Sequence, residues 1–188
     1  FYDTIVGRFD DKSKLHIIPN FVDTELYHDG VSTKELDKKL FPETDSIKLL
    51  YAGNIGFAQD CEPPIRLAEK TREQNIEYFL IGMGVKKKWV EEQKTLLGLD
   101  KLHILDYQPR HMMPAILAYS DLQYIFMTPE QEGMGFPSKV YTIMACARPL
   151  LVCSGDNTPI VNFLKPVGCA ELVTDHDLER KTDEMAKW

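Results

Sequence analysis

The sequence lacks several patterns that would place it in a common structural or functional class. Its four cysteines include no CxxC pair, which weighs against a zinc ribbon or a thioredoxin-like redox centre and predicts free buried thiols. No stretch approaches the roughly 18 apolar residues of a membrane-spanning helix. Acidic residues outnumber basic ones, 29 to 22, for a net charge of −7, which disfavours a nucleic-acid surface. These absences leave an ordinary globular α, β or α/β domain.

Motifs of several enzyme classes are also missing. We find no Walker lysine loop, no HExxH pair, no EF-hand loop and no Ser-His-Asp order. Gly82-Met83-Gly84 is followed by Val85 and lysines and does not complete the dinucleotide fingerprint, which counts against a nicotinamide or flavin oxidoreductase. The sequence therefore predicts no cofactor and no metal site, and it identifies no nucleophile.

What the sequence does have is a repeated order of apolar strand, glycine- or proline-containing loop, and helical stretch. This order predicts an α/β fold with a Rossmann-like, mostly parallel sheet of about six strands and helices on both faces. Strands are expected at residues 15–18, 47–52, 76–81, 102–105, 122–126 and 150–153, with a short edge strand at 170–173. Helices are expected at 63–72, 86–97, 112–119, 138–146 and 159–164, and residues 28–46 read as a long polar loop.

Two glycine loops follow predicted strands. Gly53-Asn54-Ile55-Gly56 follows residues 47–52, and Gly82-Met83-Gly84 follows residues 76–81. The loops after parallel strands meet at one edge of the sheet, where glycines let backbone N–H groups approach a phosphate. The alternative is that each is a plain tight turn. We expect Gly53, Asn54, Gly56, Gly82 and Gly84 to contribute backbone donors to a ligand.

Lys139 is the residue that most clearly indicates a ligand site. Pro137-Ser138 sets a helix start, and a lysine in the first turn is unfavourable unless an anion lies close by. A diphosphate held by Lys139, the free backbone amides and Ser138 explains the pattern. The alternative is a solvated lysine paired with Glu132. Arg110, in a loop at the same sheet edge, is a candidate contact to base or phosphate, whereas the lysines at 86–88 are expected to form a solvated helix face with i,i+4 pairs.

Taken in order, these landmarks resemble the C-terminal, donor-binding domain of the family 4 glycosyltransferases, which have the GT-B fold. Residues 15–23 are similar to the family segment I-P-N-G-V-D, with Phe21 in place of glycine. Residues 144–151 are similar to M-A-C-G-K-P-V-L, with Ala147 in place of glycine. The run Phe136-Pro137-Ser138-Lys139-Val140-Tyr141 most resembles the bacterial surface-polysaccharide branch that contains the colanic-acid and fucosamine transferases.

The sequence departs from the family pattern at two glutamate positions. Met134 and Thr142 stand where many members carry these glutamates, and Glu132 lies two residues out of register. Asn54 and Gln59 stand near the positions of an arginine and a lysine that grip the diphosphate in many members. If the chain follows the family, the charge of the diphosphate is therefore neutralised by Lys139, as the catalytic residue, and by Arg110. We expect the following to bind the donor: Gly53, Asn54, Gly56, Gly82, Gly84, Arg110, Gly135, Pro137, Ser138, Lys139 and Thr142.

The resemblance implies a retaining transfer from a nucleotide-diphosphate sugar, a UDP-sugar in our interpretation, in cell-surface polysaccharide biosynthesis. Both ends of the chain read as interrupted helices, so residues 1–188 are expected to be one domain of a longer protein whose N-terminal domain binds the acceptor. This chain alone is then expected to be inactive. The location is expected to be cytoplasmic, with membrane contact only through the absent domain. Two alternatives stay open: a sugar-nucleotide epimerase of similar fold, and a degenerate, non-catalytic binding module.

Overall fold

A six-stranded sheet with every neighbouring pair parallel forms the centre of the computed structural model, which describes residues 2–18, 20–132 and 135–187. The strand order is β3-β2-β1-β4-β5-β6. The strands are β1 Ile47–Ala52, β2 Ile76–Ile81, β3 Leu102–Leu105, β4 Leu122–Phe126, β5 Leu150–Cys153 and β6 Ala170–Val173. The predicted α/β, Rossmann-like fold is confirmed.

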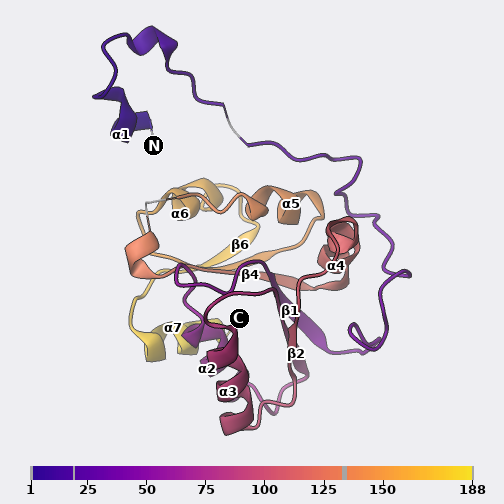
Figure 1. Cartoon of the computed structure of the whole chain (residues 1–188). Coiled ribbons are helices and arrows are strands. Elements are labelled where there is room, and N and C mark those ends of the chain that lie inside the picture. Colours follow the sequence, from indigo (N-terminus) through magenta and orange to yellow (C-terminus); the bar gives the residue numbers. More distant parts are fainter. Residues whose placement is uncertain (1, 19, 133–134, 188) are drawn as a thin grey trace.

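Helices cover both faces of the sheet (Figure 1). One face packs against α2 Glu62–Lys70, α3 Lys87–Leu97 and α7 Leu178–Met185. The other packs against α4 Met113–Tyr119, α5 Lys139–Ala145 and α6 Pro159–Leu164. Short 3-10 turns lie at Lys12–Lys14, Arg110–Met112 and Pro129–Gln131. The helices begin and end close to the predicted positions, because prolines open several of them and Gly98 closes α3 in the left-handed conformation.

The buried strands divide their side chains between two cores. In β1, Leu49 and Tyr51 join the core under α2 and α3, whereas Leu50 joins the core on the opposite face. Because successive side chains point to opposite faces, a strand covered on both sides requires apolar residues at successive positions. This double burial explains why β1, β2, β4 and β5 could be predicted from their largely apolar sequences.

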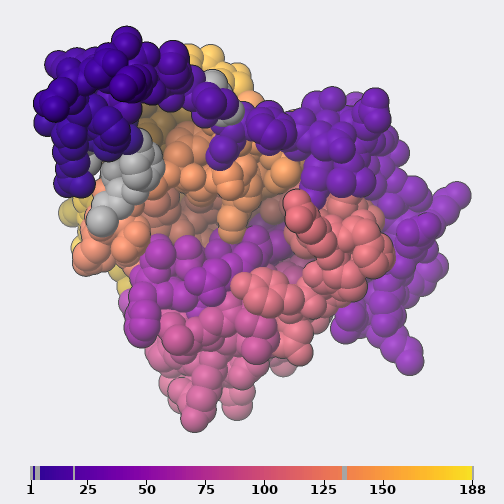
Figure 2. Space-filling view, turned by 45° about the horizontal axis from the view of Figure 1, so that its top comes forward, coloured from indigo at the N-terminus to yellow at the C-terminus, as the bar shows by residue number. Residues whose placement is uncertain are grey.

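The predicted strand at residues 15–18 is wrong. These residues are extended but unpaired, and the side chains of Ile17 and Ile18 are 73% and 82% exposed. The segment belongs to an N-terminal arm, with helix α1 Tyr2–Val6, that runs away from the body in Figure 1 and overhangs it in Figure 2. Pro19, which was expected to close this strand, lies outside the described residues.

Residues 28–46 contain no helix or strand, yet they are anchored to the domain. Leu36 and Phe41 are buried in the core beside α4. The Tyr119 hydroxyl donates a hydrogen bond to the Pro42 carbonyl at 2.7 Å. This loop therefore contributes to the hydrophobic core although its composition is largely polar.

The strand order fixes where a ligand site is expected. The chain builds outward from β1 to β3 in one direction and then from β4 to β6 in the other, so the order reverses between β1 and β4. In open α/β sheets the loops at the carboxyl ends diverge at such a switch point and leave a crevice. In the part of the chain that the structure describes, no helix has the length and apolar character needed to cross a bilayer.

Candidate functional site

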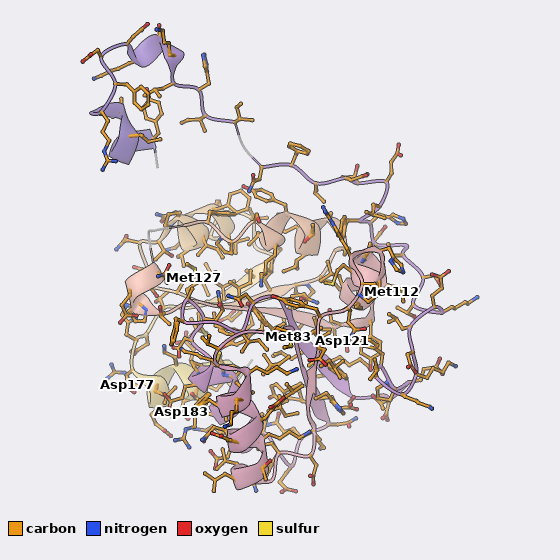
Figure 3. All side chains as sticks on the ribbon, viewed as in Figure 1. Met83, Met112, Asp121, Met127, Asp177 and Asp183 are labelled. Atoms are coloured by element: carbon orange, nitrogen blue, oxygen red, sulfur yellow. The ribbon has the colours of Figure 1, made fainter. Side chains whose placement is uncertain are left out.

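A cavity of about 210 Å³ lies at the carboxyl ends of β1 and β4, at the switch point of the sheet. Tyr51 of β1 and Phe126 of β4 form part of its wall, together with Met127, which is labelled in Figure 3. Its polar lining includes Gln59, from the loop before α2, Gln131, from the loop after β4, and Lys139, the first residue of α5. The site is thus assembled from segments on both faces of the sheet.

Lys139 reaches over the carboxyl edge toward β1. Its Nζ donates a hydrogen bond to the carbonyl of Ala52 at 3.0 Å and lies 3.8 Å from the centroid of the Tyr51 ring. Burial lowers the pKa of Lys139 to about 8. Within the described residues the ammonium has no carboxylate partner at ion-pair distance. A partly buried cation without an anionic partner is an unsatisfied charge that favours binding of an anion.

The alternative interpretation of Lys139, a solvated lysine paired with Glu132, is wrong. The Glu132 carboxylate accepts a hydrogen bond from the Gly155 N–H at 2.7 Å and lies 3.7 Å from Nε2 of His176. Glu132 therefore joins the loops that follow β4, β5 and β6, and its charge is directed away from Lys139.

The helix amides beside Lys139 contribute less than the sequence suggested. Helix α5 spans only seven residues, so its dipole is small. The N–H of Val140 already donates to the Pro137 carbonyl at 3.1 Å, and that of Tyr141 donates to the Ser138 carbonyl at 3.2 Å. The positive potential of the site rests mainly on the Lys139 side chain.

The first glycine loop offers fewer free donors than we expected. The Gly53 N–H donates to the Ile81 carbonyl at 2.9 Å, and the Ile55 N–H donates to the Met83 carbonyl at 2.8 Å. The Gly56 N–H donates to Oε1 of Gln59 at 3.1 Å. The expectation of free donors at Gly53 and Gly56 is therefore wrong. In the described part of this loop, the Asn54 N–H is the donor without a protein acceptor, and Gly56 could be released by rotation of one side chain.

The second glycine loop packs against the first and does not line the cavity. Gly82 and Gly84 have φ values of 150° and 153°. A Cβ on Gly82 would overlap the carbonyl oxygen of Gly53, and one on Gly84 would overlap that of Ile55. Glycine is needed at both positions for close backbone packing, and donor binding by Gly82 and Gly84 stays a prediction.

The remaining predicted residues fall into two groups. Gly135 and Pro137 line the cavity beside Lys139. Ser138 and Arg110 are exposed and lie outside the lining. The Thr142 hydroxyl donates to the backbone carbonyl of Lys139 at 2.8 Å, so it is hydrogen-bonded within its own helix turn. Met134 lies outside the described residues.

The sequence did not indicate the contributions of Tyr51 and Lys86, and it marked Gln59 only as a departure from the family pattern. The Nζ of Lys86 donates to the Gln59 carbonyl at 3.0 Å, whereas Lys87 and Lys88 form the predicted pairs with glutamates four residues later. Lys86 therefore supports the loop that places Gln59 in the cavity. The signal that could have identified Tyr51 is an aromatic side chain near the end of a buried strand that leads into a glycine loop.

The architecture is that of the C-terminal half of GT-B glycosyltransferases. No known family profile matches the chain. The protein of Escherichia coli K12 described as the colanic acid biosynthesis glycosyl transferase WcaI is 28% identical over 97 residues, which is 52% of this chain and 24% of that protein. The resemblance noted in the sequence is confirmed at this level, because the sequence relative and the structural neighbours are glycosyltransferases.

Two solved structures illustrate the likeness. The Anabaena protein HepE, in complex with UDP-glucose, superposes with a TM-score of 0.75 at 17% identity over 98% of this chain and 49% of that chain. The C-terminal domain of the group 1 glycosyl transferase LpcC from Francisella tularensis superposes with a TM-score of 0.62 at 16% identity over 88% of this chain and 86% of that domain. The chain thus spans about half the length of HepE and about a quarter of WcaI.

Proposed function

We propose that this chain is the donor-binding domain of a retaining glycosyltransferase that uses a UDP-sugar in the synthesis of a cell-surface polysaccharide. In this proposal residues 1–188 bind the nucleotide-diphosphate group, and a second, N-terminal domain binds the acceptor. The reaction needs no tightly bound metal, because the Lys139 ammonium supplies positive charge at the diphosphate. The chain alone binds the donor weakly and transfers no sugar.

The observation that carries the proposal is the position of the Lys139 ammonium. It lies in a cavity at the switch point of a parallel sheet, against the first glycine loop, with no carboxylate partner among the described residues. When the bond between the sugar and the β-phosphate breaks, negative charge builds on the departing diphosphate. A fixed cation in a partly desolvated site stabilises that charge more in the transition state than in the ground state.

The size of the cavity supports a site that is shared between two domains. Its volume of about 210 Å³ is below the roughly 300 to 1,000 Å³ of a complete small-molecule site. It accommodates a diphosphate but not a whole nucleotide-sugar. Neighbours such as HepE are about twice as long as this chain, and HepE was crystallised with UDP-glucose. Both facts favour a donor site completed by a second domain.

The cysteines support a cytoplasmic location in this proposal. All four are free thiols, and Cys61, Cys146 and Cys153 are buried. Unpaired cysteines are usual in reducing compartments and less so in secreted proteins. Any membrane contact would then belong to the second domain.

The test is calorimetric titration of the chain with UDP and with uridine. Lys139→Met removes the charge at nearly constant length, and Lys88→Met is the matched control because Lys88 is exposed and pairs with Glu92 on its own helix. We expect Lys139→Met to weaken UDP binding about tenfold or more, the effect of losing one charge-assisted hydrogen bond, while uridine binding and the Lys88 variant are unchanged. Equal UDP affinity in the three proteins would refute the role of Lys139.

A non-catalytic binding module is the second candidate, and one observation favours it. Thr142 stands at a family glutamate position, and its hydroxyl is bonded to the backbone carbonyl of Lys139. UDP binding by a full-length protein that neither hydrolyses nor transfers the sugar would support this candidate. An epimerase needs an acid and a base beside the sugar. The described lining of the cavity holds neither a carboxylate nor an imidazole, so an epimerase would have to use Lys139 and Tyr51 for these roles, and no observation favours that alternative.

A further inference from the structure

Tyr51 contacts both Lys139 and the first glycine loop. Its ring lies beneath the Lys139 ammonium, 3.8 Å from Nζ to centroid, and its hydroxyl donates to the Asn54 carbonyl at 2.7 Å. The ring also packs on Phe126 of β4 with centroids 4.5 Å apart. Tyr51 is only 3% exposed, so these contacts fix its orientation.

We propose that Tyr51 is the positioning residue of the donor site: its ring face holds the Lys139 ammonium toward the cavity, and its hydroxyl fixes the first glycine loop. This inference rests on the proposed function, because it concerns how the diphosphate is gripped.

The protein uses only part of the hydrogen-bonding capacity of the ammonium among the described residues. One N–H donates to the Ala52 carbonyl at 3.0 Å, and the negative face of the Tyr51 ring attracts the charge from below. The remaining donor capacity is left for a ligand in the cavity that Lys139 and Tyr51 both line. A diphosphate oxygen therefore meets an ammonium whose position is already set, which lowers the entropy cost of binding.

Gly53 is part of the same arrangement. A Cβ on Gly53 would lie 2.6 Å from Nζ of Lys139 and 3.0 Å from the hydroxyl oxygen of Tyr51. The missing side chain leaves the space in which the ammonium and the hydroxyl meet the loop. This gives the first glycine of the loop a role that is independent of its own N–H, which is bonded to Ile81.

The other titratable groups around this arrangement leave Lys139 as the residue whose charge changes near pH 8. Burial raises the pKa of Tyr51 above its usual value, so the phenol stays neutral there. Burial raises the pKa of Cys61 to about 11. Asp60 pairs with Lys181 at 3.4 Å, and Glu132 is bonded to the loop after β5. Tyr107, from the loop after β3, approaches Gly82.

The test compares UDP affinity between pH 7 and pH 10 in wild type, Tyr51→Phe and Tyr51→Leu. The phosphates of UDP are already ionised over most of this range. Titration with uridine over the same range is the control for ionisation of the uracil base, so the difference between the two profiles reports on the protein. Wild-type affinity is expected to fall as Lys139 loses its proton. Tyr51→Phe keeps the ring and is expected to keep the pH midpoint. Tyr51→Leu removes the ring, so binding at pH 7.5 is expected to weaken about tenfold and the midpoint to move to lower pH.

Each outcome separates this inference from the proposed function. If both variants bind UDP with the affinity and the pH midpoint of the wild type, the positioning role of Tyr51 is overturned. The proposed donor site would not be affected by that result. Absence of UDP binding in a folded wild type would overturn both. If Tyr51→Leu does not fold, Tyr51→Met, whose flexible side chain fills core gaps, provides the ring-free comparison. A purely structural role for Tyr51 would lower affinity without shifting the midpoint.

Discussion

Gly82 lies so close to the carbonyl group of Gly53 that any side chain at position 82 would overlap the carbonyl oxygen. The contact joins the loops after β1 and β2, which are also bonded through the Gly53 N–H and the Ile81 carbonyl. The two loops therefore form one packed unit at the edge of the cavity. The free energy of unfolding should respond to the loss of this close approach.

Gly82→Ala is expected to lower the free energy of unfolding by about 2 kcal/mol or more, because it combines steric overlap with an unfavourable φ of 150°. Gly98→Ala is the matched control. Gly98 also has a positive φ, 61°, but nothing lies within 4 Å of the added carbon, so the cost should be about 1 kcal/mol. Urea denaturation of both variants checks this, and equal costs would show that the loop contact is unimportant.

Ala147 closes helix α5 with a φ of 52°, the positive value that favours glycine. Its N–H donates to the Met144 carbonyl at 2.9 Å, and the Arg148 N–H donates to the Ile143 carbonyl at 3.2 Å, which is the Schellman pattern. Ala147→Gly is therefore expected to raise the free energy of unfolding by about 1 kcal/mol. Ala145→Gly, inside the same helix, should lower it by about as much. A loss of stability in Ala147→Gly would contradict the assignment of the cap.

Lys139 is expected to lower stability at neutral pH. Its folded pKa of about 8 lies below the ordinary value of 10.5, so between these values the unfolded state binds more protons and stability due to this residue rises with pH. Lys139→Met should be about 1 kcal/mol more stable than wild type at pH 7, with a smaller difference near pH 10. Denaturation at the two pH values measures this. A variant less stable than wild type at pH 7 would show that the ammonium is well satisfied without a ligand.

Phe41 tests whether residues 28–46 are part of the core. It is 3% exposed and stacks edge-on against Tyr119 with ring centroids 5.4 Å apart. Phe41→Ala should lower the free energy of unfolding by about 3 kcal/mol. Phe21→Ala is the control, because Phe21 is 91% exposed. If the two variants unfold alike, the loop does not contribute to folding stability.

The order of strands and helices from residue 47 onward could be predicted from the sequence because their signals are local. Each of β1, β2, β4 and β5 contains an apolar run of three or four residues, and glycine or proline marks most of the boundaries. The segment at 15–18 has the same local signal, yet it forms no strand. A strand needs a partner for its hydrogen bonds, and pairing is a non-local property that Ile17 and Ile18 do not reveal.

The candidate site was only partly predictable for the same reason. Lys139 could be identified because the adjacent Pro137 and Ser138 predict the start of its helix. The availability of the loop amides could not be predicted, because the Gly53 N–H is bonded to the carbonyl of Ile81, which lies on another strand. The contact between Lys139 and Tyr51 joins residues 88 positions apart, and only the folded sheet brings them together.

The most direct test of the account is a chemical-shift map of the isotope-labelled chain titrated with UDP. The account predicts that the largest amide shifts occur at Asn54, Gly56, Gly135 and Lys139, around the cavity where β1 and β4 end. Absence of shifts at millimolar UDP in a folded chain, or shifts gathered at the opposite edge near Ile76 and Leu102, would contradict it.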